Sequence, residues 1–201
     1  MNMKKILSFA FMALMSLGTF AQTAQHVLDK TASIIGNKSG ASANFQMSSS
    51  KYGSASGTIA IKGNKFSAHT PQATVWYNGK TQWTYMKKTN EVNVSNPTQA
   101  QQMSMNPYTF INIYKTGYTS TMKTVGSNYE VRLVAQNKKR TVQELVITID
   151  KKSYIPSKIK MRQGSSWSTI TVSNFKAKNV PNSTFTFNSK DYPSAEIVDL
   201  R

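Results

Sequence analysis

Residues that could carry out catalysis or bind a metal ion are few in this chain. The histidines are His26 and His69, and there is no cysteine, so the spacings typical of zinc sites are absent. No Gly-x-Ser-x-Gly motif occurs, and His69 has no carboxylate near it in sequence. Eight carboxylates are scattered, mostly at predicted turns or near the C-terminus: Asp29, Glu91, Glu130, Glu144, Asp150, Asp191, Glu196 and Asp199. Folding could bring two of them together across a cleft, as glycoside hydrolysis needs. We nevertheless expect no enzyme, no metal site and no cofactor.

Large apolar side chains, in contrast, are abundant in the sequence. The whole chain has nine Phe, nine Tyr, three Trp and ten Met. The stretch YNGKTQWTY, residues 77–85, places aromatic arms on both sides of Asn78-Gly79, the dipeptide most typical of a two-residue β-turn. This predicts a hairpin whose aromatic residues either fill an ordinary core or line a space for a ligand.

The elements around this hairpin are mostly short strands. Leu28, Thr31, Ala32 and Ile35 follow helical spacing before Gly36, which predicts one short helix with a single apolar stripe. Apolar and polar residues then alternate in segments 41–47, 55–61, 66–68, 75–77, 83–85, 92–94, 129–135, 145–149, 155–161, 167–172 and 185–187. Roughly ten antiparallel strands in sequence order predict a strongly curved sheet that approaches a barrel.

One segment, residues 96–118, interrupts the alternation. Pro97 and Pro107 each suit the first turn of a short helix, and the residues after Pro107 are apolar almost all round. A helix buried across one end of the sheet and a mobile lid over it both fit this composition.

The N-terminus has the features of a secretory signal peptide. Lys4 and Lys5 precede an apolar stretch, and Thr19-Phe20-Ala21 is a small-x-small cleavage site. We expect cleavage after Ala21, leaving residues 22–201 as a single soluble, exported domain. Without cysteine this domain has no disulfide, and it lacks the lipidated cysteine that anchors bacterial lipoproteins.

The charge balance is strongly basic. The chain has 25 Lys and Arg against 8 acids, and removal of Lys4 and Lys5 leaves 23 against 8, a net charge of +15. Export argues against nucleic acid as a partner, and the lysines are not clustered. A solvated basic surface and attraction to anionic membranes or acidic partners remain as two interpretations.

Four stretches, taken in order, are similar to a known family. They are GTIAIKGNKFSAHT (57–70), VWYNGKTQWTYMKKTNEVNV (75–94), NPYTFINIY (106–114) and the predicted closing Phe-x-Phe strand in TFTFNSKDYPSAEIVDL (184–200). Together they resemble the LolA-type family of periplasmic outer-membrane lipoprotein carrier proteins. The resemblance implies a mainly β fold with short helices, in which a curved antiparallel sheet forms an unclosed β-barrel with a helical lid. It also implies a monomeric periplasmic carrier that takes acylated lipoproteins from an inner-membrane release complex to an outer-membrane acceptor.

Two positions depart from the family's pattern. Well-studied members have an Arg after the Lys that ends the strand before the Phe-bearing strand, and this Arg hydrogen-bonds to the lid. Gly63 stands at that place here, so control of the lid must differ. Ala68 stands where the family has a Trp on the next strand, so details of the pocket should not transfer.

The resemblance implies that apolar residues of alternating strands line an acyl-binding cavity. We expect the lining to include Phe45, Met47, Ile59, Ile61, Phe66, Trp83, Tyr85, Phe110, Ile113, Leu133, Ile147 and Met161. A register slip of one residue would exchange the two faces of any strand, and Trp76 and Trp167 are the main omissions from this set.

Two other functions fit the same sequence. One is an exported regulator of related fold that senses lipid chains. The other is a β-sandwich adhesin or carbohydrate-binding module, whose aromatic residues would form an exposed platform.

Overall fold

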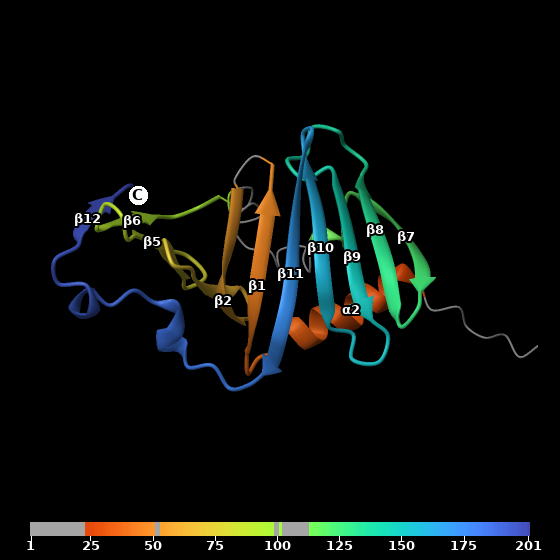
Figure 1. Ribbon diagram of the computed structural model, residues 1–201, viewed down its shortest axis with the longest axis horizontal. Coiled ribbons are helices and arrows are strands. Elements are labelled where there is room, and N and C mark those ends of the chain that lie inside the picture. Colours follow the sequence, from red (N-terminus) through yellow and green to blue (C-terminus); the bar gives the residue numbers. More distant parts are fainter. Residues whose placement is uncertain (1–22, 51–52, 99–100, 102–112) are drawn as a thin grey trace, which may run out of the picture.

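The computed structural model describes residues 23–50, 53–98, 101 and 113–201, and shows a continuous curved sheet with a helix across one side (Figure 1). The helix α2 spans Ala24–Ile35. The strands are β1 (Ala41–Ser49), β2 (Gly53–Lys62), β3 (Lys65–His69), β4 (Ala73–Tyr77), β5 (Gln82–Met86), β6 (Glu91–Ser95), β7 (Tyr118–Val125), β8 (Asn128–Ala135), β9 (Glu144–Asp150), β10 (Pro156–Gln163), β11 (Ser166–Ala177) and β12 (Glu196–Asp199). Two short 3₁₀ turns, Asn182–Phe185 and Ser189–Asp191, lie between β11 and β12.

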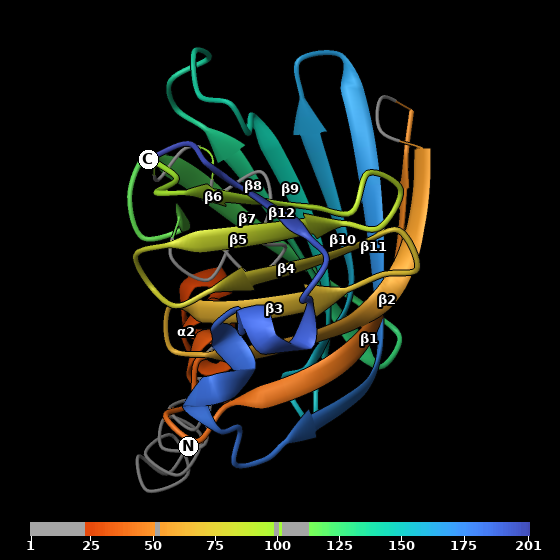
Figure 2. The ribbon, with the colours of Figure 1, turned by 90° about the vertical axis from the view of Figure 1, so that its left-hand side faces the viewer.

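The twelve strands form a single sheet in the order β12-β6-β5-β4-β3-β2-β1-β11-β10-β9-β8-β7. Every neighbouring pair is antiparallel except β12 and β6, which run parallel. Because β12 and β7 end the order, the sheet curves without closing (Figure 2). The predicted mainly β fold with an unclosed barrel is therefore confirmed. The predicted lid lies largely in residues 99–100 and 102–112, which are outside the described residues.

The helix α2 ends before Gly36, as the sequence predicted, and it begins after Thr23. The Thr23 hydroxyl accepts a hydrogen bond from the His26 amide at 3.2 Å, and the Gly36 amide donates to the Ala32 carbonyl at 2.8 Å. Its stripe of Val27, Leu28, Thr31 and Ile35 is buried. The apolar members of the stripe belong to the main hydrophobic core, so α2 packs on one face of the sheet. We call this side, which carries Ile59, Ile61 and Phe66, the concave face, and the opposite side the outer face.

The C-terminal segment, residues 178–200, lies on the outer face and returns to the far edge of the sheet (Figure 2). Its start is held by the Val180 amide, which donates to the Ser39 carbonyl at 2.8 Å, and by the Lys62 amine, which donates to the Val180 carbonyl at 2.8 Å. Its end pairs as β12 with β6. Two faces of the sheet are therefore covered by different parts of the chain.

Three strand predictions were wrong. Phe185 and Phe187, expected in a closing strand, lie in and after a 3₁₀ turn. The strands β7 and β12 were missed. In β7, YTSTMKTV, the residues around Tyr118 and Met122 are mostly hydroxyl or charged side chains, so apolar alternation is weak. The four residues of β12 are too few to show a period, and their pairing with β6 is a long-range contact.

Among the described residues, no helix has the length and apolar composition needed to cross a bilayer.

We expect Gly57→Ala to destabilise the fold. A Cβ atom at Gly57 would lie 1.9 Å from the His69 carbonyl oxygen and 3.3 Å from the Phe45 ring. Since the first of these is a backbone atom, β2 and β3 must separate to relieve the overlap, at a cost of about 1–3 kcal/mol. Denaturant unfolding measures this cost, and Ser56→Ala, at the neighbouring position, is the control. Equal stability of the Gly57→Ala and control variants would contradict the close approach of these strands.

Candidate functional site

The pairing register places eight of the twelve predicted lining residues on the concave face. Directly paired residues share a face, and residues two apart on a strand share it as well. Met47 pairs with Ile170, Ile170 with Ile159, and Ile159 with Ile147, so parity carries from β1 to β9. The residues united in this way are Phe45, Met47, Ile59, Ile61, Phe66, Leu133, Ile147 and Met161.

These eight residues differ in how far they are covered. Ile59, Ile61, Phe66, Leu133 and Ile147 are buried and belong to the packed core. Phe45, Met47 and Met161 are only half-buried, although they pack against that core. The concave face therefore has a packed part and an accessible apolar part.

Ala68 and Val75 extend the accessible part onto the next strands. Ala68 pairs with Ile59 and with Val75, so both share the concave face, and both are half-buried. The small side chain of Ala68 fills little of this part of the face. Apolar surface that a fold leaves uncovered has the chemistry to take an apolar ligand.

Two further predicted lining residues belong to the apolar segment that precedes β7. Ile113 is buried in the same core as α2 and the concave face. Phe110 lies outside the described residues.

Trp83 and Tyr85 do not share the face of the other predicted residues. Phe66 pairs with Tyr77, and Tyr77 with Gln82, so Gln82 rather than Trp83 continues the concave face. Trp83 pairs with Trp76, which places both rings on the outer face with Tyr85. The expectation that these aromatic arms line the same cavity as Phe66 therefore does not fit the register.

The outer aromatic residues pack beneath the C-terminal segment. The Trp76 ring lies 5.5 Å from the rings of both Phe187 and Tyr192, and Tyr85 lies 4.6 Å from Tyr192, measured between centroids. Trp76 is only 7% exposed as a result. The aromatic arms of the hairpin thus fill a second small core, and an exposed aromatic platform is absent at this place. The sequence signal for this second core was the pair of aromatic residues Phe187 and Tyr192. It was missed because Phe187 was assigned to a closing strand.

The turn that joins these arms is longer than predicted. Tyr77 pairs with Gln82, so four residues rather than two connect β4 and β5. The Asn78 side-chain oxygen accepts hydrogen bonds from the amides of Lys80 at 3.0 Å and Thr81 at 2.9 Å. Side-chain bonding of this kind stabilises a wider loop, which competes with the two-residue turn.

Gly63 lies beside a hollow at one end of the concave face. It takes a positive φ of 59° in the β2–β3 turn, and a Cβ there would meet nothing within 4 Å. The hollow, about 390 Å³, also involves Asp29 and Tyr114, whose hydroxyl donates to the Asp29 carboxylate at 2.5 Å. Burial, together with this carboxylate, raises the pKa of Tyr114, so the hydroxyl stays protonated. A tyrosine–aspartate hydrogen bond therefore ties α2 to the residues before β7, beside Gly63.

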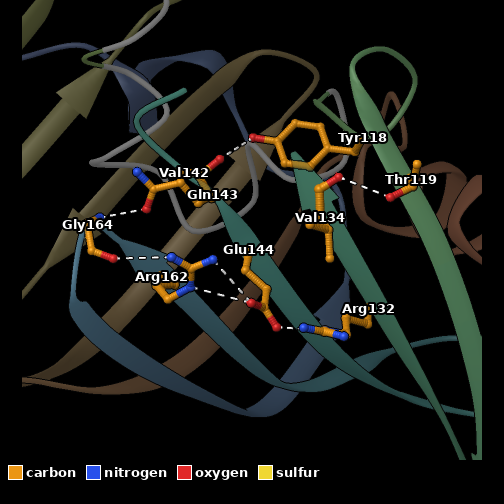
Figure 3. A network of polar contacts seen from close by, with 9 residues as sticks. All are labelled: Tyr118, Thr119, Arg132, Val134, Val142, Gln143, Glu144, Arg162 and Gly164. Carbon is orange, nitrogen blue, oxygen red and sulfur yellow. Dashed lines mark hydrogen bonds and ion pairs between the residues drawn. The ribbon is translucent and has the colours of Figure 1, made fainter. Parts of the chain in front are cut away.

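A carboxylate clamp holds the other half of the sheet on its outer face (Figure 3). Glu144 on β9 accepts from Arg132 on β8 at 2.7 Å and from Arg162 on β10 at 3.4 Å. The hydrogen bond from Arg132 is the main cause that lowers the pKa of Glu144, and Arg162 adds to it. Within the described ranges, no three His, Cys, Asp or Glu side chains gather as a metal site, and this acid serves structure.

Comparison with known families agrees with this architecture. A sequence model of the family described as outer membrane lipoprotein carrier protein LolA matches residues 15–165, which is most of the chain. The protein belongs to the LolA family. The match ends just before β11, so the C-terminal segment lies beyond it. Members of this LolA family are carriers rather than enzymes.

Several solved structures are similar to this chain at low sequence identity. An uncharacterized conserved protein from Thermus thermophilus is 14% identical, with a TM-score of 0.59, and 88% of this chain and 98% of that chain are covered. A LolA superfamily protein from Nitrosomonas europaea is 13% identical, with a TM-score of 0.46 and coverage of 83% and 99%. A putative lipoprotein-sorting domain from Vibrio parahaemolyticus is 10% identical, with a TM-score of 0.46 and coverage of 85% and 97%. No curated protein sequence matches the chain.

We expect the Glu144 clamp to contribute stability at neutral pH and to lose it in acid. The folded-state pKa of Glu144 is lowered, so its contribution is present above the unfolded pKa of about 4.3 and disappears as pH falls through the folded value. Glu144→Gln should lower the free energy of unfolding by about 1–2 kcal/mol at pH 7 and flatten its decline between pH 5 and pH 3. Denaturant unfolding across this pH range provides the measurement. Glu130→Gln is the control, because Glu130 on β8 forms a more exposed ion pair with Lys123. An unchanged acid dependence in Glu144→Gln would argue against the clamp.

Proposed function

We propose that this protein is a periplasmic carrier and chaperone that binds the acyl chains of lipoproteins on its concave face. The observation that carries the proposal is the accessible apolar part of that face, formed by half-buried Phe45, Met47 and Met161 within an unclosed sheet. The wall then includes the neighbouring concave residues Ile59, Ile61, Phe66, Leu133 and Ile147, with Ile113 at its margin. Trp83 and Tyr85 are left out because they face the other way.

The direction of transport that we propose follows the family. The protein would receive acylated lipoproteins from an inner-membrane release complex and deliver them to an outer-membrane acceptor, acting as a monomer. Removal of residues 1–21 after export would release residues 22–201 into the periplasm. The family is periplasmic, and this supports the proposed compartment.

The physics of acyl burial favours an adaptable, partly open face. Each acyl methylene gains about 0.8 kcal/mol when it leaves water, and a bilayer provides the same gain. A carrier must therefore bind acyl chains about as well as its donor and less well than its acceptor. Half-buried Met47 and Met161 suit this need, because unbranched thioether side chains repack around ligands of different shape.

We expect Met47→Asp to weaken binding of a fluorescent fatty acid by at least about tenfold, while Ser48→Asp leaves it nearly unchanged. The two positions are adjacent on β1, but Met47 faces the concave side and Ser48 the outer side, so both variants add the same charge to the same strand. A carboxylate on the concave face lowers the favourable free energy of acyl binding by more than one lost apolar contact does, because the bound chain would displace the water that the carboxylate needs. Fluorescence titration of residues 22–201 gives the affinities, and circular dichroism checks that each variant is folded. Met47→Ser serves as a milder second variant if Met47→Asp does not fold. Equal binding by the Met47 and Ser48 variants would remove the concave face as the binding site.

Transport itself requires a second assay. Residues 22–201 are added to spheroplasts that hold newly made lipoproteins destined for the outer membrane, and the soluble fraction is examined for complexes. Release that Ser48→Asp retains and Met47→Asp loses is the expected result. Fatty-acid binding without lipoprotein release would favour a lipid-sensing protein over a carrier. Failure of both assays would mean that the apolar face serves only as a hydrophobic core.

A further inference from the structure

The central strands of the sheet carry no acidic residue. The strands β10, β11, β1 and β2 are neighbours in the sheet, and their sequences contain no Asp or Glu. They contain five cations, Lys62, Lys158, Lys160, Arg162 and Lys176. The pairing register assigns all five to the outer face, because each lies on the side of its strand opposite to the concave residues Ile59 and Ile170. The outer face of these four strands, which we call the cationic face, is thus positive, although Arg162 is ion-paired with Glu144 of the neighbouring strand β9.

The acids of the protein are placed elsewhere. Glu91, Glu196 and Asp199 lie at the β6–β12 edge, while Glu130 and Glu144 form ion pairs on β8 and β9. Lys158, Lys160 and Lys176 are exposed, and they take part in none of the ion pairs found in the described part of the chain. Their ammonium groups are therefore available to an external anion.

Two hollows on this side of the sheet are lined in part by groups that can donate hydrogen bonds. One, about 450 Å³, involves the outward side chains of Gln46, Ser48, Ser56, Thr169 and Thr171, together with the apolar residues Met47, Ala55 and Pro71. The other, about 580 Å³, involves Ser42, Asn44, Thr58, Lys176 and Lys178. Hydroxyl, amide and ammonium groups all donate to phosphate oxygens, so both hollows suit phosphate-bearing head groups.

Trp167 adds an interfacial aromatic side chain to the cationic face. It pairs with Arg162 in register, which assigns it to the outer side, and it is 40% exposed. The Arg162 guanidinium lies 6.0 Å from the centre of its ring. Trp is enriched where lipid head groups meet the apolar interior, because its ring is amphipathic.

We propose that the cationic face is a docking surface for membranes that contain anionic phospholipids. The docking surface lies on the opposite side of the sheet from the acyl-binding face and does not depend on it. Each lysine near an anionic bilayer strengthens binding by roughly fivefold, so three unpaired lysines contribute on the order of a hundredfold. Docking through this face would hold the protein at a membrane while the concave face stays open to cargo.

The test compares two triple variants with the same loss of charge. The first is Lys158→Gln/Lys160→Gln/Lys176→Gln on the cationic face, and the second is Lys80→Gln/Lys87→Gln/Lys88→Gln, at exposed positions around β4–β6. Flotation with vesicles of phosphatidylcholine mixed with phosphatidylglycerol measures binding, and vesicles of phosphatidylcholine alone are the reference. We expect the wild type to prefer the anionic vesicles and to lose this preference at high salt. The first variant should bind on the order of a hundredfold more weakly, whereas the second should change by less than about fivefold.

Further variants separate this proposal from its alternatives. Trp167→Ala should reduce binding to anionic vesicles by several-fold, because it removes the ring that would lie among the lipid head groups. Equal losses in the two triple variants would show an effect of total charge and overturn the proposal. Absence of binding to anionic vesicles, or equal binding to neutral ones, would overturn it as well.

Discussion

Hydrogen-bonded pairing across one sheet decides which side chains of this protein can meet. Every residue of a strand points to one of two faces, and each pairing passes that choice to the next strand. Eleven pairings carry it from β12 to β7. A core formed with α2 on one face therefore fixes the position of each hydroxyl, lysine and aromatic ring on the other. The site, the aromatic packing beneath the C-terminal segment and the cationic face all follow from this single alternation.

The two halves of the sheet meet this constraint in different ways. In β8 to β11 the concave face is largely covered and the outer face is solvated, so apolar and polar residues alternate. In β4 and β5 both faces are covered, because Tyr77 points into the main core and Trp76 packs under Tyr192. Aromatic residues then occur on both faces and the alternation of the strand is lost. The short strands β3 to β6 gain from this second core the burial that their own length does not provide.

The sequence was sufficient for features that local chemistry controls. The helix from Ala24 to Ile35, most of the strands and the open curved sheet follow from periodicity, caps and turns. The features that the sequence did not predict depend on contacts between residues far apart in the chain. The rings of Trp76 and Tyr85 are covered by Tyr192, more than a hundred positions later, and β12 exists through its pairing with β6. The incomplete burial of Phe45 and Met47 depends on curvature, which no local pattern records. The contact between Tyr114 and Asp29, near the Gly63 departure, is long-range for the same reason.

A sheet one residue thick lets two surfaces of different chemistry share the same strands. Along β1, Phe45 and Met47 give the concave side its apolar character, while Asn44, Gln46 and Ser48 give the outer side its polar one. Because these residues alternate, a substitution on one face alters the other only through the backbone. An apolar ligand on the concave side contributes no charge to the cationic face, and an anionic surface outside removes no apolar contact within. Binding on the two faces can therefore vary separately in strength, which suits a protein that meets both a bilayer and the chains drawn from it.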